Sequence, residues 1–203
     1  MLRRHRIIAV IRADSWYIAE KMAETAINAG IRLIEVTWNS INPAPFTAYL
    51  RQKYPHCYIG VGTIINLADL KTALDAGAQF VFCPHFDLDL LNFAHNRQIP
   101  LIPGTFSPSE IINAFRGGAL VVKVFPIQCL GGVNYIKALQ GPMAQYPLIP
   151  TGGVTMAQTK AFLDAGALAV GLASDLFPPH LVLEEKWTVM GAVIAENLAK
   201  ING

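Results

Sequence analysis

Short apolar runs recur along the chain and predict buried strands. Four of them follow a segment that ends in glycine, at residues 33–37, 80–83, 120–125 and 168–172. Four more have a similar composition, at residues 7–11, 58–62, 99–102 and 148–150. Continuous apolar runs of this length are typical of parallel strands that are covered on both faces.

The segments between these runs carry the signals of helices. Glycines at 30, 77, 118 and 166 can adopt the left-handed conformation that ends a helix. Ser107 followed by Pro108 predicts a helix start, as does Asp87. Strands that alternate with helices eight times favour an α/β fold, a single-domain (β/α)8 TIM barrel over residues 1–203. An open doubly wound sheet is the alternative.

Composition agrees with one well-buried domain, since 53% of the 203 residues are hydrophobic and 15% are charged. The net charge is +2, and the basic residues are scattered except for Arg3, Arg4 and Arg6. Small anions are therefore favoured over nucleic acid as partners. The apolar run after this cluster is too short for a signal peptide or a membrane span, so we expect a cytoplasmic protein without a membrane partner.

The cysteines and histidines do not form a metal-binding pattern. Cys57, Cys83 and Cys129 are odd in number and widely spaced, and we interpret them as reduced core thiols. The histidines lack metal-ligand spacing, and His85, after Pro84, is the one nearest a strand end. We expect neither a metal nor an organic cofactor.

Two charged residues lie inside apolar strands. Lys123 is enclosed by Val122 and Val124, and burial favours the neutral amine, which can attack a carbonyl. Glu35 lies in a similar run and is a candidate for proton transfer. The structural alternative is that the lysine pairs with a buried carboxylate, for which Glu35 is the obvious counter-ion.

Further polar residues follow the strands, where barrel enzymes form their active face. They are Arg12, Thr63, Thr151 and Ser174, and Thr37 is the last residue of the second strand. Thr151 begins a Thr-Gly-Gly turn whose amides, with Gly152 and Gly153, can bind an anion at a helix start. Ser174 after the eighth strand completes the usual phosphate site of barrels. A plain structural turn, and a surface ion pair for Arg12, are the alternatives.

Several segments together resemble the class I (Schiff-base) 2-keto-3-deoxy-6-phosphogluconate aldolases, also described as 4-hydroxy-2-oxoglutarate aldolases. The similarity extends over nearly the whole chain. The segments that carry it are Val-Ile-Arg-Ala at 10–13, Ile-Glu-Val-Thr at 34–37, Gly-Val-Gly-Thr at 60–63, Cys-Pro-His at 83–85, Ile-Pro-Gly at 102–104, Lys-Val-Phe-Pro at 123–126 and Pro-Thr-Gly-Gly-Val at 150–154.

The resemblance implies a role for each matching residue. Lys123 would form the Schiff base and Glu35 would shuttle protons. The remaining residues would bind substrate: Thr63 and Thr151 the pyruvate portion, Arg12 an anionic group, and Gly152, Gly153 and Ser174 the distal phosphate. Pro84 would also contact the substrate. The implied reaction is reversible cleavage of a 2-keto-3-deoxy-6-phospho sugar acid to pyruvate and glyceraldehyde 3-phosphate, catalysed by a homotrimer.

Some positions depart from the family pattern. Asn39 and Ser40 after the second strand are similar to the related galactonate-type aldolases, and Ala173 replaces a common glycine. Gln128 replaces a frequent glutamate, and Cys83 a frequent serine. The 6-phosphogalactonate epimer and unphosphorylated 4-hydroxy-2-oxoglutarate are therefore alternative substrates. A non-catalytic phosphate-binding barrel and a divalent-metal aldolase are further alternatives.

Overall fold

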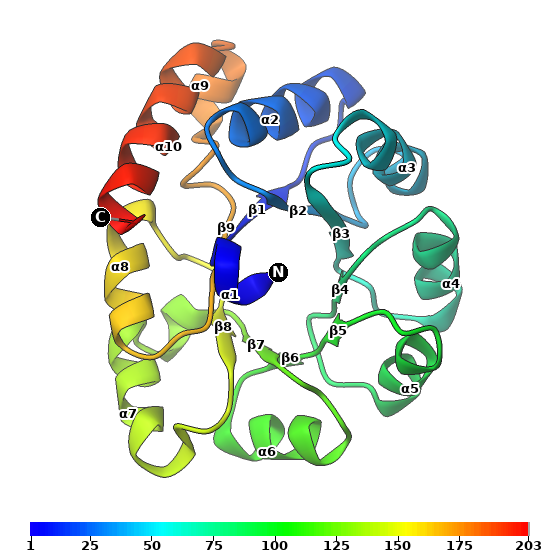
Figure 1. Ribbon diagram of the computed structural model, residues 1–203, viewed down its shortest axis with the longest axis vertical. Helices are drawn as coiled ribbons and strands as arrows, with labels where there is room; N and C mark the ends of the chain where they lie inside the picture. Colours follow the sequence, from blue (N-terminus) through cyan, green and yellow to red (C-terminus); the bar gives the residue numbers. More distant parts are fainter. Residues whose placement is uncertain (203) are drawn as a thin grey trace.

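The computed structural model describes residues 1–202, with side chains to residue 201, and its strands alternate with helices (Figure 1). The strands are β1 (Ile7–Ile11), β2 (Leu33–Thr37), β3 (Tyr58–Gly62), β4 (Val81–Phe82), β5 (Leu101–Ile102), β6 (Gly104–Thr105), β7 (Val122–Val124), β8 (Leu148–Pro150) and β9 (Val170–Leu172). The helices are α1 (Leu2–His5), α2 (Trp16–Asn28), α3 (Pro43–Lys53), α4 (Leu67–Asp75), α5 (Leu88–Asn96), α6 (Pro108–Arg116), η1 (Ile127–Leu130), α7 (Val133–Met143), α8 (Met156–Asp164), α9 (Pro179–Leu183) and α10 (Trp187–Asn202).

All the strand pairings are parallel. Six strands form a half-barrel in the order β5-β4-β3-β2-β1-β9, and a second sheet has the order β6-β7-β8. A bridge between Thr151 and Gly171, and a hydrogen bond from Leu168 N to Leu148 O (2.9 Å), connect β8 with β9. In Figure 1 the strands surround the centre of the molecule, α1 lies over that centre, and the other helices lie outside the strands.

Of the strand expected at 99–102, only the second half is observed, as β5, and a further short strand, β6, follows Pro103 outside the expected range. Proline has no amide hydrogen to donate, so the regular ladder stops at this residue. Its carbonyl still accepts a hydrogen bond from Lys123 N (2.9 Å). As a result β5 pairs with β4, whereas β6 pairs with β7. The expected runs at 80–83, 120–125 and 168–172 are likewise longer than the observed strands.

The predicted helix starts are confirmed. Ser107 Oγ accepts a hydrogen bond from Glu110 N (3.3 Å), and the Glu110 carboxylate accepts one from Ser107 N, which makes a capping box. Asp87 caps α5 by accepting from Leu90 N (2.9 Å). Each such cap stabilises its helix by about 1 kcal/mol. These caps fix where the helices begin relative to the strand ends that precede them.

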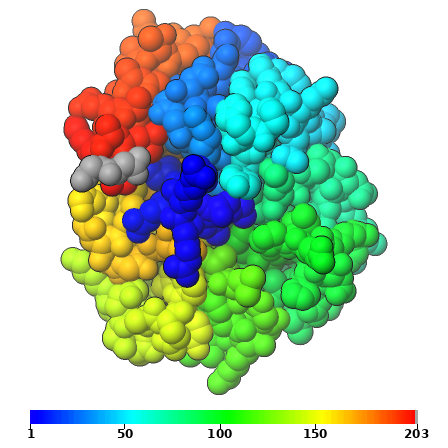
Figure 2. Space-filling model, in the orientation of Figure 1, coloured from blue at the N-terminus to red at the C-terminus, as the bar shows by residue number. Residues whose placement is uncertain are grey.

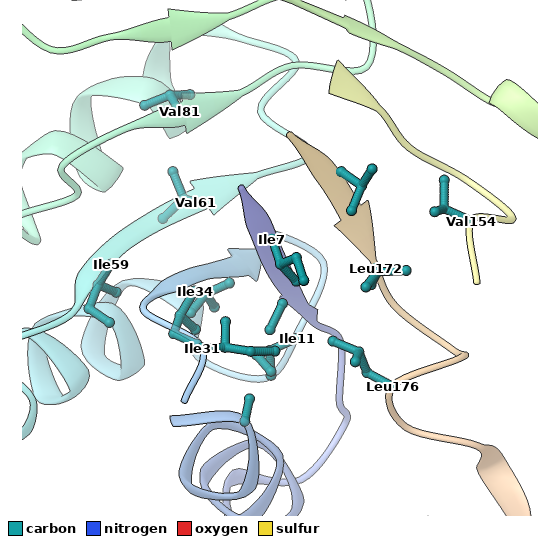
Figure 3. Packing of buried hydrophobic residues seen from close by; sticks show 14 of the residues in the cluster. Ile7, Ile11, Ile31, Ile34, Ile59, Val61, Val81, Val154, Leu172 and Leu176 are labelled. Atoms are coloured by element: carbon teal, nitrogen blue, oxygen red, sulfur yellow. The ribbon is translucent and has the colours of Figure 1, made fainter. Parts of the chain in front are cut away.

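Two hydrophobic layers share the strands. The inner one lies between the strands themselves and consists of Ile8, Val10, Leu33, Phe80, Phe82, Ile102, Val121, Ile149 and Ala169. The outer one fills the space between strands and helices and includes Ile34, Val36, Val122 and Val124. Figure 3 shows part of the outer layer, with side chains of β1, β2 and β3 beside those of β9. Since side chains alternate along a strand, Glu35 and Lys123 belong to the inner set.

One expectation about the cysteines is wrong. Cys57 and Cys83 are buried as expected. Cys129 is exposed because it lies in η1, a 3-10 turn on the surface after β7. All three are free thiols.

None of the helices within residues 1–202 combines the length and apolarity that a membrane crossing requires. Within the same residues, no three His, Cys, Asp or Glu side chains come together as a metal site.

Candidate active site

Lys123 is held rigidly in the centre of β7. Its amide donates to Pro103 O (2.9 Å), and its carbonyl accepts from Thr105 Oγ1 (3.0 Å). The residue pairs with Gly104 on one side and Ile149 on the other, and it is only 6% exposed. Neighbouring strands therefore fix the backbone from which the amino group projects.

The amino group of Lys123 lies among aromatic rings. Its Nζ is 4.4 Å from the ring centroid of Phe125 and 5.9 Å from that of Phe82. Among the side chains of residues 1–201, none forms an ion pair or a hydrogen bond with this amino group. The alternative in which Lys123 forms an ion pair with a buried carboxylate is therefore not observed among the described side chains.

Glu35 is the second buried charge, at 3% exposure on β2. Burial raises the pKa of its carboxyl above the ordinary 4.5, and the positive charges of Lys123 and Arg12 oppose that rise. A carboxyl whose pKa is raised by burial holds its proton more readily than an exposed one and can still release it, which suits proton transfer. Glu35 and Lys123 thus lie within electrostatic reach of each other inside the strand ring.

The Glu35 side chain lies against Gly62 on the neighbouring strand. A Cβ atom on Gly62 would be 2.5 Å from Glu35 Cδ and 2.9 Å from its Cγ. Ordinary carbon–carbon contacts are about 3.5 Å or longer. Only glycine leaves room for the carboxylate at this position, so Gly62 shapes the site although it brings no functional group.

Three more predicted residues follow the strands at the same end. Arg12 is exposed directly after β1, and its charge acts on Glu35. Thr63 follows β3 with a φ of 64°, a left-handed conformation that is strained for a β-branched residue. Pro84 lines a cavity of about 280 Å³ together with Gly104, Thr105 and Phe125. Neither Lys123 nor Glu35 is among the described lining of that cavity, which lies beside the lysine strand.

The Thr151-Gly152-Gly153 turn is open to solvent at its glycines. Thr151 is buried, whereas Gly153 is exposed. The carbonyl groups of Thr151 and Gly152 accept hydrogen bonds from Ile127 N (2.9 Å) and Gln128 N (3.1 Å). Both glycines have positive φ, 86° and 82°. The turn is therefore anchored to η1 through its carbonyl groups, and among the described residues the amides of Gly152 and Gly153 donate no hydrogen bond.

A carboxylate already occupies the helix start beside this turn. Asp175 Oδ2 accepts a hydrogen bond from Met156 N (2.6 Å), the first residue of α8. Ser174, next to it, is exposed after β9. The bridge between Thr151 and Gly171 brings the turn and the end of β9 together. The grouping of Ser174 itself with the turn stays a prediction.

Sequence reasoning missed three residues of this region: Gly62, Thr105 and Asp175. Gly62 lies in a Gly-Val-Gly-Thr segment, where a glycine within a strand signals close approach of another group. Thr105 is hidden by the break at Pro103. Asp175 has no local signal, because its partner Met156 is distant in sequence.

Comparisons with known proteins agree with this geometry. The family model for KDPG and KHG aldolase matches residues 1–193. The 2-dehydro-3-deoxy-phosphogluconate aldolase of Pseudomonas aeruginosa is 34% identical over 98% of this chain and 91% of its own length. The KHG/KDPG aldolase of Escherichia coli is 32% identical over 77% of this chain and 74% of its own length.

Among solved structures, KDPG aldolase from Legionella pneumophila superposes with a TM-score of 0.87 and is 28% identical, covering 96% of this chain and 95% of that one. That protein was captured with pyruvate as a covalent carbinolamine intermediate. The match along the sequence and the match in three dimensions agree, and the chain belongs to the KDPG and KHG aldolase family.

Proposed function

We propose that this protein is a metal-independent class I aldolase that cleaves 2-keto-3-deoxy-6-phosphogluconate to pyruvate and glyceraldehyde 3-phosphate through a Schiff base on Lys123. The observation that carries the proposal is the buried amino group of Lys123, without an ion-pair partner among the described side chains, within electrostatic reach of buried Glu35. Family membership supports the same chemistry.

The lysine acts as nucleophile. The lone pair of Lys123 Nζ forms a bond with C2 of the keto acid, and the former carbonyl oxygen takes a proton, which gives a carbinolamine. A second proton on that oxygen lets water leave and produces a protonated imine. The aromatic rings of Phe82 and Phe125 near Nζ exclude bulk water from this step.

Glu35 moves the protons. As a carboxylate it takes the proton of the C4 hydroxyl while the C3–C4 bond breaks, and the bond electrons move toward the imine nitrogen to form an enamine. The aldehyde leaves, and Glu35 returns the proton to C3. Water then releases pyruvate. A carboxyl whose pKa is raised by burial is suited to both directions of transfer.

The remaining residues bind substrate in this proposal. Thr63 and Thr151 contact the pyruvate portion, Pro84 also contacts the substrate, and Arg12 binds an anionic group by charge-assisted hydrogen bonds. The amides of Gly152 and Gly153, with Ser174, hold the distal phosphate. The positive φ values of both glycines support this role, because they let the backbone approach an anion closely.

Borohydride trapping tests the proposal. With pyruvate and borohydride, the wild-type protein should gain one pyruvate adduct, located on Lys123 by peptide mass mapping, and Lys123→Met should gain none and lose aldol cleavage. Lys137→Met is the matched control, since Lys137 is exposed on α7. An adduct on another lysine, or cleavage that survives in Lys123→Met, refutes the mechanism. Loss of wild-type activity on chelation would instead support a metal aldolase. If the protein cleaved no keto acid at all, the result would support a non-catalytic barrel.

A second candidate substrate is unphosphorylated 4-hydroxy-2-oxoglutarate. The observation that favours it is the Asp175 carboxylate on the α8 amide of Met156, which puts negative charge where a phosphate would benefit from the helix start. Comparing kcat/KM for the two substrates and for the 6-phosphogalactonate epimer decides between them. In Asp175→Asn, kcat/KM for the phosphorylated substrate should rise, and no change would remove this argument.

We also propose that residues 1–203 form one domain in which the strands close into a (β/α)8 barrel. The link between β8 and β9, and the pairing of β5 and β6 with different neighbours on either side of Pro103, support closure. The homotrimer implied by the family resemblance is a further proposal, which sedimentation equilibrium tests. The cytoplasmic location remains a prediction.

A further inference from the structure

A cavity of about 370 Å³ lies at the opposite end of the strands from the candidate active site. Its lining comes from three segments: Arg3 and Arg6 in or beside α1, residues 144–147 before β8, and residues 163–168 before β9. Both of the last two segments enter strands, whereas the site residues follow strands. Figure 2 shows the N-terminal segment lying across the centre of this face.

Within the part of the chain that the structure describes, the two arginines of this cavity have no side-chain partner. Both are exposed, and among the side chains described to residue 201 neither forms an ion pair or donates a hydrogen bond. Helices α7 and α8 end nearby and together contribute about one negative charge through their dipoles. Two guanidinium groups contribute two positive charges, so the cavity retains a net positive potential.

The surroundings strengthen this potential. The pKa of His5 is lowered by burial and then by the positive charges of Arg4, the chain N-terminus and Arg32. Arg32 is engaged with the carbonyls of Ile27 (2.7 Å) and Ile31 (2.9 Å) and adds its charge without entering the cavity. This end of the molecule therefore attracts anions before any contact forms.

Arg6 occupies its position at a conformational cost. Its φ is 44°, in the left-handed region that residues other than glycine rarely adopt. The conformation is held from both sides, since Arg6 N donates to Leu2 O (3.0 Å) and Arg6 O accepts from Val170 N (2.9 Å). Strain of this kind persists where the surroundings fix it and is concentrated at functional sites. Its effect here is to fix the backbone that carries the Arg6 guanidinium at the cavity.

The rest of the wall is mixed. Tyr146, Pro147, Leu163 and Leu168 give it apolar surface beside the polar Gln145, and the Tyr146 ring packs on Phe115 at 4.5 Å between centroids. Guanidinium groups match phosphate oxygens with paired hydrogen bonds. Apolar walls with a few convergent polar groups are the usual composition of a small-molecule site. A phosphate group with two negative charges would suit the two arginines, and an apolar organic group attached to it would suit the apolar side chains.

We propose that the cavity between Arg3, Arg6 and Tyr146 is a second binding site, separate from the Lys123 site, for a small phosphate monoester. Arg3 and Arg6 would bind the phosphate group, and Tyr146 with Leu168 would cover the organic portion.

Amide shift mapping by NMR tests the proposal, with phenyl phosphate as the probe and inorganic phosphate as its comparison. Phenyl phosphate should shift the amides of residues 3–6, 145–148 and 166–168 saturably, and more tightly than inorganic phosphate. Shifts at Thr151, Gly152, Gly153 and Ser174 are counted separately, because the proposed active site also binds phosphate. Arg3→Gln and Arg6→Asn should each weaken binding at the first set by about tenfold, the value of a charge-assisted hydrogen bond. Asparagine is chosen at position 6 because it tolerates a left-handed backbone.

Arg4→Gln is the matched control. It removes the same charge from the same helix, but Arg4 does not line the cavity. Its effect on binding should stay below about threefold, the weak contribution of an exposed charge. Equal weakening by Arg4→Gln and Arg3→Gln would mean diffuse electrostatic attraction and would overturn the proposal. Equal affinity for the two probes, or no saturable shift in residues 3–6, would overturn it as well.

Discussion

Gly62→Ala perturbs the candidate site without touching a functional group. The added Cβ would overlap Glu35 Oε1 and lie 2.5 Å from Glu35 Cδ, so the carboxylate must move by at least about 1 Å to restore ordinary contacts. Gly62 has no positive φ, and its backbone therefore accepts alanine without strain. The whole effect should arise from the displaced Glu35 side chain.

The expected magnitudes follow from that displacement. Misplacing a reacting group by about 1 Å lowers kcat by about 100-fold. Overpacking lowers the free energy of unfolding by about 1 to 3 kcal/mol. In a Glu35→Ala background the clash disappears, and Gly62→Ala should instead be neutral or stabilising by up to about 1 kcal/mol, because alanine restricts the unfolded chain.

The assay combines coupled detection of pyruvate release with urea unfolding of the four proteins of the double-mutant cycle. Gly141→Ala in α7 is the control, since no heavy atom lies within 4 Å of a Cβ there; it should leave kcat unchanged. If Gly62→Ala retains wild-type kcat, the position of Glu35 does not matter for turnover. If its cost in stability is the same with and without the Glu35 side chain, the clash lies elsewhere and the reasoning fails.

Three further predictions concern protonation and strain. The pKa of Glu35 in the folded state lies above 4.5, so between the unfolded and the folded pKa the native state keeps a proton that the unfolded state has released. The free energy of unfolding therefore falls as pH rises from the unfolded pKa to the folded pKa. Glu35→Gln removes this fall, so its stability relative to wild type in urea should be greater at pH 8 than at pH 4, and an equal difference at both would contradict the raised pKa. Burial raises the pKa of Cys83 to about 12 and also raises that of Cys57, so a thiol reagent at pH 8 should modify exposed Cys129 alone in the native protein, and rapid labelling of a second thiol would contradict this. Thr63→Gly should raise the free energy of unfolding by about 1 kcal/mol by relieving its left-handed strain, while kcat/KM falls through loss of the hydroxyl; lower stability would show that Thr63 is held by contacts that outweigh the strain.

Local patterns in the sequence predicted most of the fold. The apolar runs located the strands because each is buried on both faces, and the caps at Asp87 and Ser107 located helix starts through side-chain chemistry within four residues. The break at Pro103 shows the limit. A proline in an apolar run signals a missing amide hydrogen, but which neighbour each half pairs with depends on strands far along the chain.

The candidate site was predictable to the extent that it depends on the side-chain alternation of strands. Period two places Lys123 and Glu35 on the inner face, opposite Val122 and Val36. Distances across the ring were not predictable. The bond from Asp175 to Met156, and the exposure of Cys129 in a turn expected to be core, arise from tertiary packing that no local pattern encodes.

The two hydrophobic layers have a consequence for how this protein can change over generations. Helices are fastened to strands by the outer layer, so residues of the inner layer can vary without loosening that attachment. New chemistry can therefore arise by exchanging every second strand residue, while the alternate residues preserve the scaffold. A library that varies Val10, Phe82 and Ile149 among apolar residues should retain more folded members than one that varies Ile11, Val81 and Leu148 in the same way.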